Sequence, residues 1–160
     1  MSRIENEALF LRIVNQYGIG PKLLYHEKNK LVCEFVKGEF ILDYFVKNKK
    51  YKIKKVIRDL FKQLYTLDQL KINKEEMSHP QKHILIGKKN NPVLIDFERC
   101  RYSIKPSNVT QFCDFLISKH LATILKNNNL KIDNKKMIDA AKQYKKQQNK
   151  NNFNNIISLI

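Results

Sequence analysis

Residues 51–69 carry the feature that most limits the possible folds of this chain, a long stretch with apolar side chains at helical spacing. The apolar positions are Ile53, Val56, Ile57, Leu60, Phe61, Leu64 and Leu67. They recur every three or four residues, which places them on one face of a helix. The opposite face is basic, with Lys52, Lys54, Lys55, Arg58 and Lys62. Such a helix needs a protein core on one side, so the rest of the chain is expected to pack around it.

Short apolar segments on each side of this helix have the pattern of β-hairpins. Residues 23–25 and 31–36 are separated by a charged turn, and residues 84–86 and 93–95 are separated by the polar segment 87–91. Short apolar runs bounded by turn residues are typical of strands that pair with their neighbour in sequence. We therefore expect two antiparallel hairpins.

Helical spacing of apolar residues also predicts helices elsewhere. They are expected over residues 5–17, 40–45, 106–124 and 134–148. Asn108 followed by Gln111 resembles a capping box at the start of the third of these helices. The tail from Gln147 to Asn155 is low in complexity, and we expect it to be partly disordered. Four apolar residues near the end could still dock on the core: Phe153, Ile156, Ile157 and Leu159.

The element order is helix, hairpin, helices, hairpin, helices, which predicts an α+β fold. No alternation of strands and helices indicates a parallel sheet, and no glycine-rich nucleotide loop is present. The chain has 160 residues, of which 42% are hydrophobic. That is enough for one domain with a core, and two separate cores are not expected. Residues 1–160 are therefore interpreted as a single domain.

The charge of the chain is unusual for its length. Lysine and arginine number 31 against 15 acidic residues, which gives a net charge of +16. A surplus of this size favours anionic partners such as RNA, DNA, nucleotides or an anionic surface. The alternative explanation is a lysine-rich proteome in which these side chains are simply solvated.

Other classes of protein are disfavoured. The three cysteines (Cys33, Cys100 and Cys113) are widely spaced and match neither a disulfide framework nor a zinc site. The N-terminus lacks the apolar run of a signal peptide. No apolar stretch approaches the length of about 20 residues that a membrane helix needs. We expect a soluble, cytoplasmic protein.

The segment Pro92-Val93-Leu94-Ile95-Asp96-Phe97 carries the most specific chemical signal. The apolar run predicts a short buried strand that ends at the carboxylate of Asp96, and His83 begins the preceding predicted strand, thirteen residues upstream. A carboxylate oxygen at the end of a strand is a suitable ligand for Mg²⁺. The sequence thus predicts that Asp96 and His83 point at the same place.

The order of elements resembles the protein-kinase-like superfamily, and more closely the small RIO-like and KEOPS-associated predicted Ser/Thr kinases. The resemblance runs from about Glu5 to the C-terminal helices, and residues 94–97 resemble the Asp-Phe-Gly strand of that family. It implies a kinase-like C-lobe with an αC helix and a hinge hairpin, and a truncated N-lobe. Residues 1–38 would be the residual N-lobe and hinge, residues 39–146 the helical C-lobe, and residues 147–160 a tail.

The resemblance also implies roles for individual residues. Glu7 takes the place of the αC glutamate that pairs with a phosphate-contacting lysine. Backbone groups of Glu34, Phe35 and Val36 would bind the adenine of ATP. Asp96 would bind Mg²⁺. The implied cofactors are therefore ATP and Mg²⁺.

Four departures from the family pattern bear on activity. Glu98 replaces the glycine of Asp-Phe-Gly. His83 stands where the family has asparagine, and imidazole is a poorer partner for Mg²⁺. The catalytic aspartate position falls on Ser78, which is not an effective base at neutral pH, and Glu76 is the alternative. Only six residues precede Glu7, so the glycine-rich loop and the strand lysine have no counterpart before it.

Two functions follow as competing hypotheses. The first is a phosphotransferase of the Ser/Thr protein kinase type, incomplete or weakly active alone. A partner chain, or a segment encoded upstream of Met1, would supply the missing lobe. The alternative is a catalytically silent pseudokinase scaffold that binds RNA, a ribonucleoprotein or another acidic partner. Its contact surface would be the basic stretch from Lys47 to Lys62.

Overall fold

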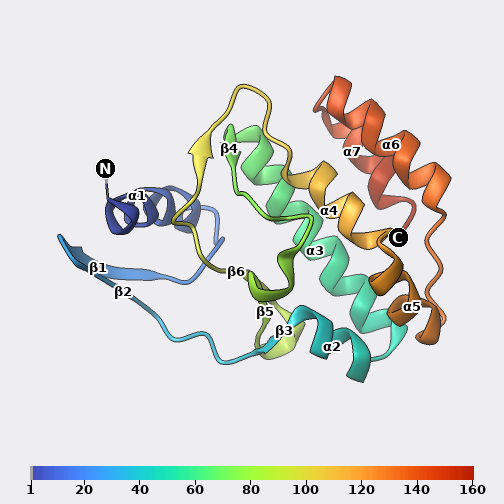
Figure 1. Cartoon of the computed structure of the whole chain (residues 1–160), viewed down its shortest axis with the longest axis horizontal. Helices are drawn as coiled ribbons and strands as arrows, with labels where there is room; N and C mark the ends of the chain where they lie inside the picture. Colours follow the sequence, from blue (N-terminus) through green and yellow to red (C-terminus); the bar gives the residue numbers. More distant parts are fainter. Residues whose placement is uncertain (1) are drawn as a thin grey trace.

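The long amphipathic helix expected over residues 51–69 is present as α3 (Lys50–Gln69), and it runs through the middle of the fold (Figure 1). The computed structural model describes residues 2–160. All seven predicted apolar residues of α3 are shielded from solvent. Because this face is fully covered, the prediction of a central helix with a core on one side is confirmed.

Helices from the second half of the chain cover α3. The helices α4 (Asn108–Leu116) and α7 (Lys150–Ile157) pack on α3, and α6 (Asn134–Lys146) packs on both of them. The helices α2 (Ile41–Lys47) and α5 (Lys119–Asn127) pack against each other near one end of α3 (Figure 1). One continuous cluster of buried apolar residues extends from Phe10 to Ile160.

The N-terminal segment forms a helix and a hairpin that lie to one side of the helices (Figure 1). Helix α1 (Arg3–Asn15) is followed by the antiparallel strands β1 (Leu23–Glu27) and β2 (Lys30–Cys33). Between α1 and β1, Gly18 and Gly20 both have a positive φ, a conformation that glycine adopts without strain. The predicted helix and first hairpin are confirmed, although the second strand ends three residues earlier than expected.

The second hairpin lies between the N-terminal segment and α3. It consists of β5 (Ile84–Ile86) and β6 (Pro92–Leu94), and β3 (Glu39–Phe40) pairs with β5 to give the order β3-β5-β6. The remaining elements are the strand pair β4 (Ile72–Asn73) and β7 (Arg101–Tyr102) and two short 3-10 turns, η1 (Pro80–Lys82) and η2 (Lys88–Asn90). All sheets in the described residues are antiparallel, so the α+β prediction is confirmed.

Three predictions about the C-terminal half are wrong. The helix expected over residues 106–124 is broken into α4 and α5, because Ser118 caps a new helix by accepting a hydrogen bond from Leu121. Asn108 does not cap α4, since its side chain is buried and bonded to Asp68. The tail is not partly disordered: it forms α7, whose Phe153 is buried in the core.

No helix within residues 2–160 is both long enough and apolar enough to cross a bilayer.

Candidate metal centre

The hairpin β5–β6 brings His83 and Asp96 together. Ile84 pairs with Leu94 in the antiparallel register, so the residues just outside this pair also face each other. The backbone N–H of Ile95 donates a hydrogen bond to the carbonyl oxygen of His83 at 3.0 Å. The side chains meet just beyond that bond, with Nδ1 of His83 3.5 Å from Oδ2 of Asp96. The predicted convergence of these two residues is therefore present.

Glu76 joins them from the loop between β4 and η1. Its Oε2 lies 2.8 Å from Nε2 of His83, and its Oε1 lies 2.8 Å from Nη1 of Arg99. Glu76 has a φ of 71°, in the left-handed region that non-glycine residues seldom adopt. Donor atoms of Glu76, His83 and Asp96 all lie within 4.8 Å of one another. We call these three residues the acidic–histidine cluster.

The protonation state of His83 decides what this cluster can bind. Burial lowers the pKa of His83, and the charge of Lys74 lowers it further, although Glu76 and Asp96 act in the opposite direction. These effects favour the neutral imidazole. Nε2 lies 2.8 Å from a carboxylate oxygen of Glu76, and we assign the single ring proton to Nε2 on the basis of this contact.

The other ring nitrogen then has only a lone pair. Nδ1 of His83 is buried and has no hydrogen-bond partner among residues 2–160. It lies 3.5 Å from a carboxylate oxygen of Asp96, so with the ring proton on Nε2 two electron-pair donors face each other. A cation in contact with both would remove this repulsion. The arrangement, in which a carboxylate orients a histidine whose second nitrogen faces a metal, is common in metal sites. The cluster therefore fits a divalent cation.

Lys74 holds the backbone of Asp96 in place through a hydrogen bond. Its side chain is only 2% exposed, and its ammonium group donates a hydrogen bond to the carbonyl oxygen of Asp96. The same group lies 5.0 Å from the centre of the Phe97 ring. Asp96 has a φ of 64°, and the bond to its carbonyl helps to hold that strained conformation. Burial lowers the pKa of Lys74, and the carboxylates of Asp96, Glu76 and Glu7 oppose that effect.

Glu7 contacts the same turn from helix α1. Its Oε1 accepts a hydrogen bond from the backbone N–H of Phe97 at 3.1 Å. Burial raises the pKa of Glu7, the charges of Asp96 and Glu98 raise it further, and the hydrogen bond from Phe97 opposes the rise. The turn at residues 96–97 is thus held by Lys74 on one residue and by Glu7 on the next.

The remaining predicted site residues lie outside the cluster. Ser78 is next to His79, with its Oγ 3.1 Å from Nδ1 of that ring. Glu34 accepts a hydrogen bond from the backbone N–H of Lys22, and its own N–H donates to the Lys22 carbonyl. Phe35 is 90% exposed and Val36 is partly buried.

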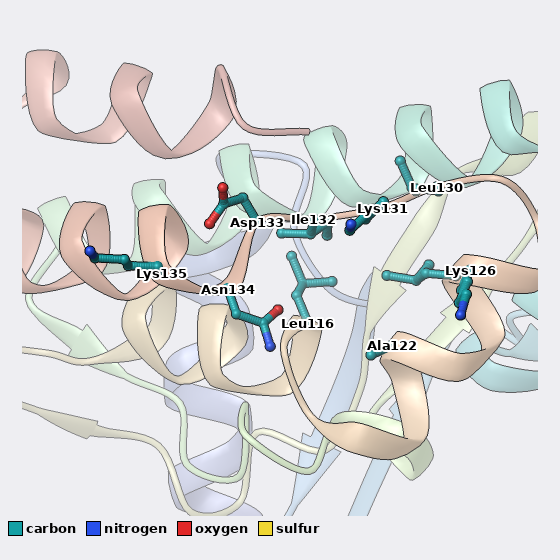
Figure 2. Close-up of a pocket in the computed structure, with 10 residues that line it drawn as sticks. Leu116, Ala122, Lys126, Leu130, Lys131, Ile132, Asp133, Asn134 and Lys135 are labelled. Carbon is teal, nitrogen blue, oxygen red and sulfur yellow. The ribbon is translucent and has the colours of Figure 1, made fainter.

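The hollow that includes Glu34 shares no lining residue with the acidic–histidine cluster. It is lined by α1, the turn that follows it and β1. A hollow of about 790 Å³ lies elsewhere, between α4, α5 and the start of α6 (Figure 2). The adenine-binding role predicted for residues 34–36 stays a prediction.

Two residues of the site were missed by sequence reasoning. Lys74 carries no sequence signal, because a lysine beside acidic residues is usually solvated, and its burial results from packing under Phe97. Arg99 is also without a signal, since the turn that brings it to Glu76 is not apparent from residue spacing.

Comparison with known proteins identifies no relative that would assign a function to this cluster. No family model matches the chain, and no curated protein matches it.

Proposed function

We propose that this chain is the large-lobe part of a protein-kinase-like phosphotransferase of the Ser/Thr kinase type. The observation that carries the proposal is the acidic–histidine cluster, in which the buried Nδ1 of His83 lies 3.5 Å from a carboxylate oxygen of Asp96 and has no hydrogen-bond partner among residues 2–160. A divalent cation would be held by Asp96 and His83. When bound, such a cation neutralises charge on the phosphate groups of a nucleotide.

The arrangement of elements supports a kinase-like C-lobe. In the proposed correspondence, α1 is the αC helix and the hairpin β5–β6 carries the metal-binding strand. The contact from Glu7 to the backbone of Phe97 joins these two parts, as expected if helix position is linked to the metal site. The helices around α3 form the rest of the lobe.

The residues of the cluster have separate roles in this proposal. Asp96 supplies a carboxylate oxygen, and His83 supplies Nδ1. Glu76 fixes the tautomer and orientation of His83 through Nε2, and Arg99 holds the second oxygen of Glu76. Both candidates for the base position are engaged, Ser78 with His79 and Glu76 with His83 and Arg99, so the proposal assigns Glu76 only the orienting role and leaves the base position open.

A partner that supplies the other lobe is part of the proposal. Strands β1 and β2 pair only with each other in the described residues and pack on α1, so each strand has an outer edge on which a further strand could pair. Leu24, Tyr25 and Phe35 are exposed on or beside this hairpin. Additional strands that covered these residues would also close the adenine side of the site near residues 34–36.

The choice of cation is a further element of the proposal. Imidazole suits Mn²⁺ and other transition ions better than it suits Mg²⁺, whereas carboxylates suit both. We therefore expect tighter binding of Mn²⁺ than of Mg²⁺ by the isolated chain. Replacement of His83 by asparagine would restore an amide oxygen and move the preference toward Mg²⁺.

Isothermal titration calorimetry with Mn²⁺ and Mg²⁺, each with and without ATP, tests the proposal. Asp96→Asn should weaken Mn²⁺ binding at least 10-fold, and Glu76→Gln should weaken it about 10- to 100-fold, as for other groups that orient a ligand. The matched control is Asp43→Asn, an exposed aspartate of α2. No binding of either cation at millimolar concentration, or equal affinities for Asp96→Asn and the control, would refute the metal site. Cation binding with no effect of ATP would refute the nucleotide part alone.

A further inference from the structure

Helix α6 presents a row of lysines to solvent. Lys135, Lys142 and Lys146 lie 7 and 4 residues apart in sequence, so they share one face of the helix. The opposite face carries Met137 and Tyr144, both buried in the core. The lysine face therefore lies on the solvent side of the helix, and it extends for roughly 16 Å at about 1.5 Å per residue.

These lysines form no ion pairs with the described part of the chain. Asp139 is the single acidic residue on their face of the helix. Lys135 and Lys136 also lie in the first turn of α6, where the positive end of the helix dipole disfavours a cation. An anionic ligand on this face would offset the repulsion between neighbouring lysines and the repulsion between the first-turn lysines and the helix dipole.

The basic stretch from Lys47 to Lys62 differs in this respect. Lys47 pairs with Glu39, Lys55 and Lys62 pair with Asp59, and Arg58 donates to the carbonyl oxygen of Ile160. Several of its charges are therefore already neutralised or engaged. The surface around α6 carries more unpaired charge than the stretch that the sequence singles out.

A hollow lies at each end of the row formed by Lys135, Lys142 and Lys146. At the first end, a hollow of about 790 Å³ is lined by Lys126, Lys131 and Lys135 and one carboxylate, Asp133, around apolar residues that include Leu116 and Ile132 (Figure 2). At the other end, a hollow of about 590 Å³ is lined by Lys142, Lys145 and Lys146, by Lys105 from the loop after β7, and by one carboxylate, Asp139. Three separate segments thus add lysines to the same row.

We propose that this surface binds the phosphodiester backbone of single-stranded nucleic acid. The lysine track consists of Lys105, Lys126, Lys131, Lys135, Lys142 and Lys146, all of them exposed. Its length suits several consecutive phosphates, since nucleotides repeat every 3.4 Å or more along a strand. The apolar wall of the larger hollow can receive an unpaired base, which a duplex does not offer. This inference does not depend on the proposed phosphotransferase function.

Fluorescence anisotropy with labelled 12-nucleotide probes tests this inference. The probes are oligo(U) RNA, oligo(dT) DNA and a 12-base-pair DNA duplex, each titrated with the full chain at 50 and 200 mM salt. If about five phosphates are neutralised, log K falls with log salt at a slope near −3.5, so affinity drops about 100-fold between these concentrations. Both single strands should bind more tightly than the duplex, and the tighter of the two identifies the natural source of the backbone.

Two triple variants with the same change of charge locate the binding surface. Lys135→Gln, Lys142→Gln and Lys146→Gln together should weaken binding at 50 mM salt at least 10-fold and lower the magnitude of the slope by about 2. Lys49→Gln, Lys50→Gln and Lys54→Gln together form the control, and affinity should change less than 3-fold. All six side chains lack ion pairs within residues 2–160, and circular dichroism verifies that both variants fold.

Several outcomes would overturn the inference. Equal losses in the two triple variants would mean that only net charge matters, and a larger loss in the control would move the surface to α3. Binding of the duplex as tight as that of the single strands would exclude the role of the hollow. Oligoglutamate that competes with the RNA at equal concentration would indicate an acidic protein as the partner.

Discussion

Replacement of Asn108 by alanine should be among the most damaging single changes in this protein. The Asn108 side chain is fully buried and makes three hydrogen bonds of 2.7 Å. Nδ2 donates to Oδ1 of Asp68 and to the carbonyl oxygen of Ile72, and Oδ1 accepts from the backbone N–H of Lys74. These bonds join the end of α3, strand β4 and the start of α4, and they fix the backbone of the lysine under Asp96.

The magnitude follows from the groups that lose their partners. Alanine leaves a buried carbonyl and a buried N–H without a hydrogen bond and removes one donor from Asp68. Each buried group left unsatisfied costs about 1–3 kcal/mol. We expect a total loss of about 3–5 kcal/mol, since some water can enter the space. Small domains have a free energy of unfolding of about 5–15 kcal/mol, so the variant should be marginally stable.

Urea unfolding followed by far-UV circular dichroism measures this loss. With a slope near 2 kcal/mol per molar urea, the midpoint should fall by about 1.5–2.5 M. The matched control is Asn154→Ala, an exposed asparagine of α7, which should change stability by less than about 0.5 kcal/mol. If Asn108→Ala lost no more than about 1 kcal/mol relative to that control, the reasoning from buried hydrogen bonds would be refuted.

Three further predictions concern other contacts. Tyr144→Phe removes the hydroxyl that donates to Asp68 at 2.9 Å, so urea unfolding should report a loss of about 1–2 kcal/mol, and no loss would contradict that bond. Because burial raises the pKa of Glu7, the folded state binds its proton more tightly than the unfolded state. Stability should therefore fall as pH rises from the unfolded pKa through the raised folded value, and Glu7→Gln should flatten that part of a melting-temperature profile. In Gly38→Ala, the new Cβ would lie 2.6 Å from the carbonyl oxygen of Ile86 and should separate β3 from β5, at a cost of about 1–3 kcal/mol in the same urea assay; a change within 0.3 kcal/mol would show that the backbone can shift freely.

Much of the fold follows from local patterns. The hydrophobic period of α3 and the two hairpins fixed by short polar turns are confirmed, because each depends on residues close together in sequence. The predictions that are wrong concern segments whose structure depends on contacts with residues distant in sequence. A serine at position 118 interrupts one helical pattern, and the asparagine-rich tail forms a helix because Phe153 and Ile156 can be buried against helices from earlier in the chain.

The candidate site divides in the same way. His83 and Asp96 could be predicted together, because a hairpin converts a sequence spacing into a fixed register. Glu76 could be identified only as an alternative to Ser78. The backbone of Glu76 has a positive φ, and sequence does not reveal where such a loop points the side chain. Lys74 could not be predicted at all, because its burial depends on Phe97 and Asn108, which are distant in sequence.

The amino-acid sequence by itself determined the secondary structure around α3, the pairing of β5 with β6 and the excess of positive charge. These properties follow from hydrophobic periodicity, turn composition and residue counts, and all of them are local or additive. Tertiary structure alone decided which charges remain unpaired and which groups surround the ring nitrogens of His83. Those properties depend on burial and on partners brought from distant parts of the chain, so the orphaned Nδ1 of His83 and the free lysines of α6 became visible only in the folded protein.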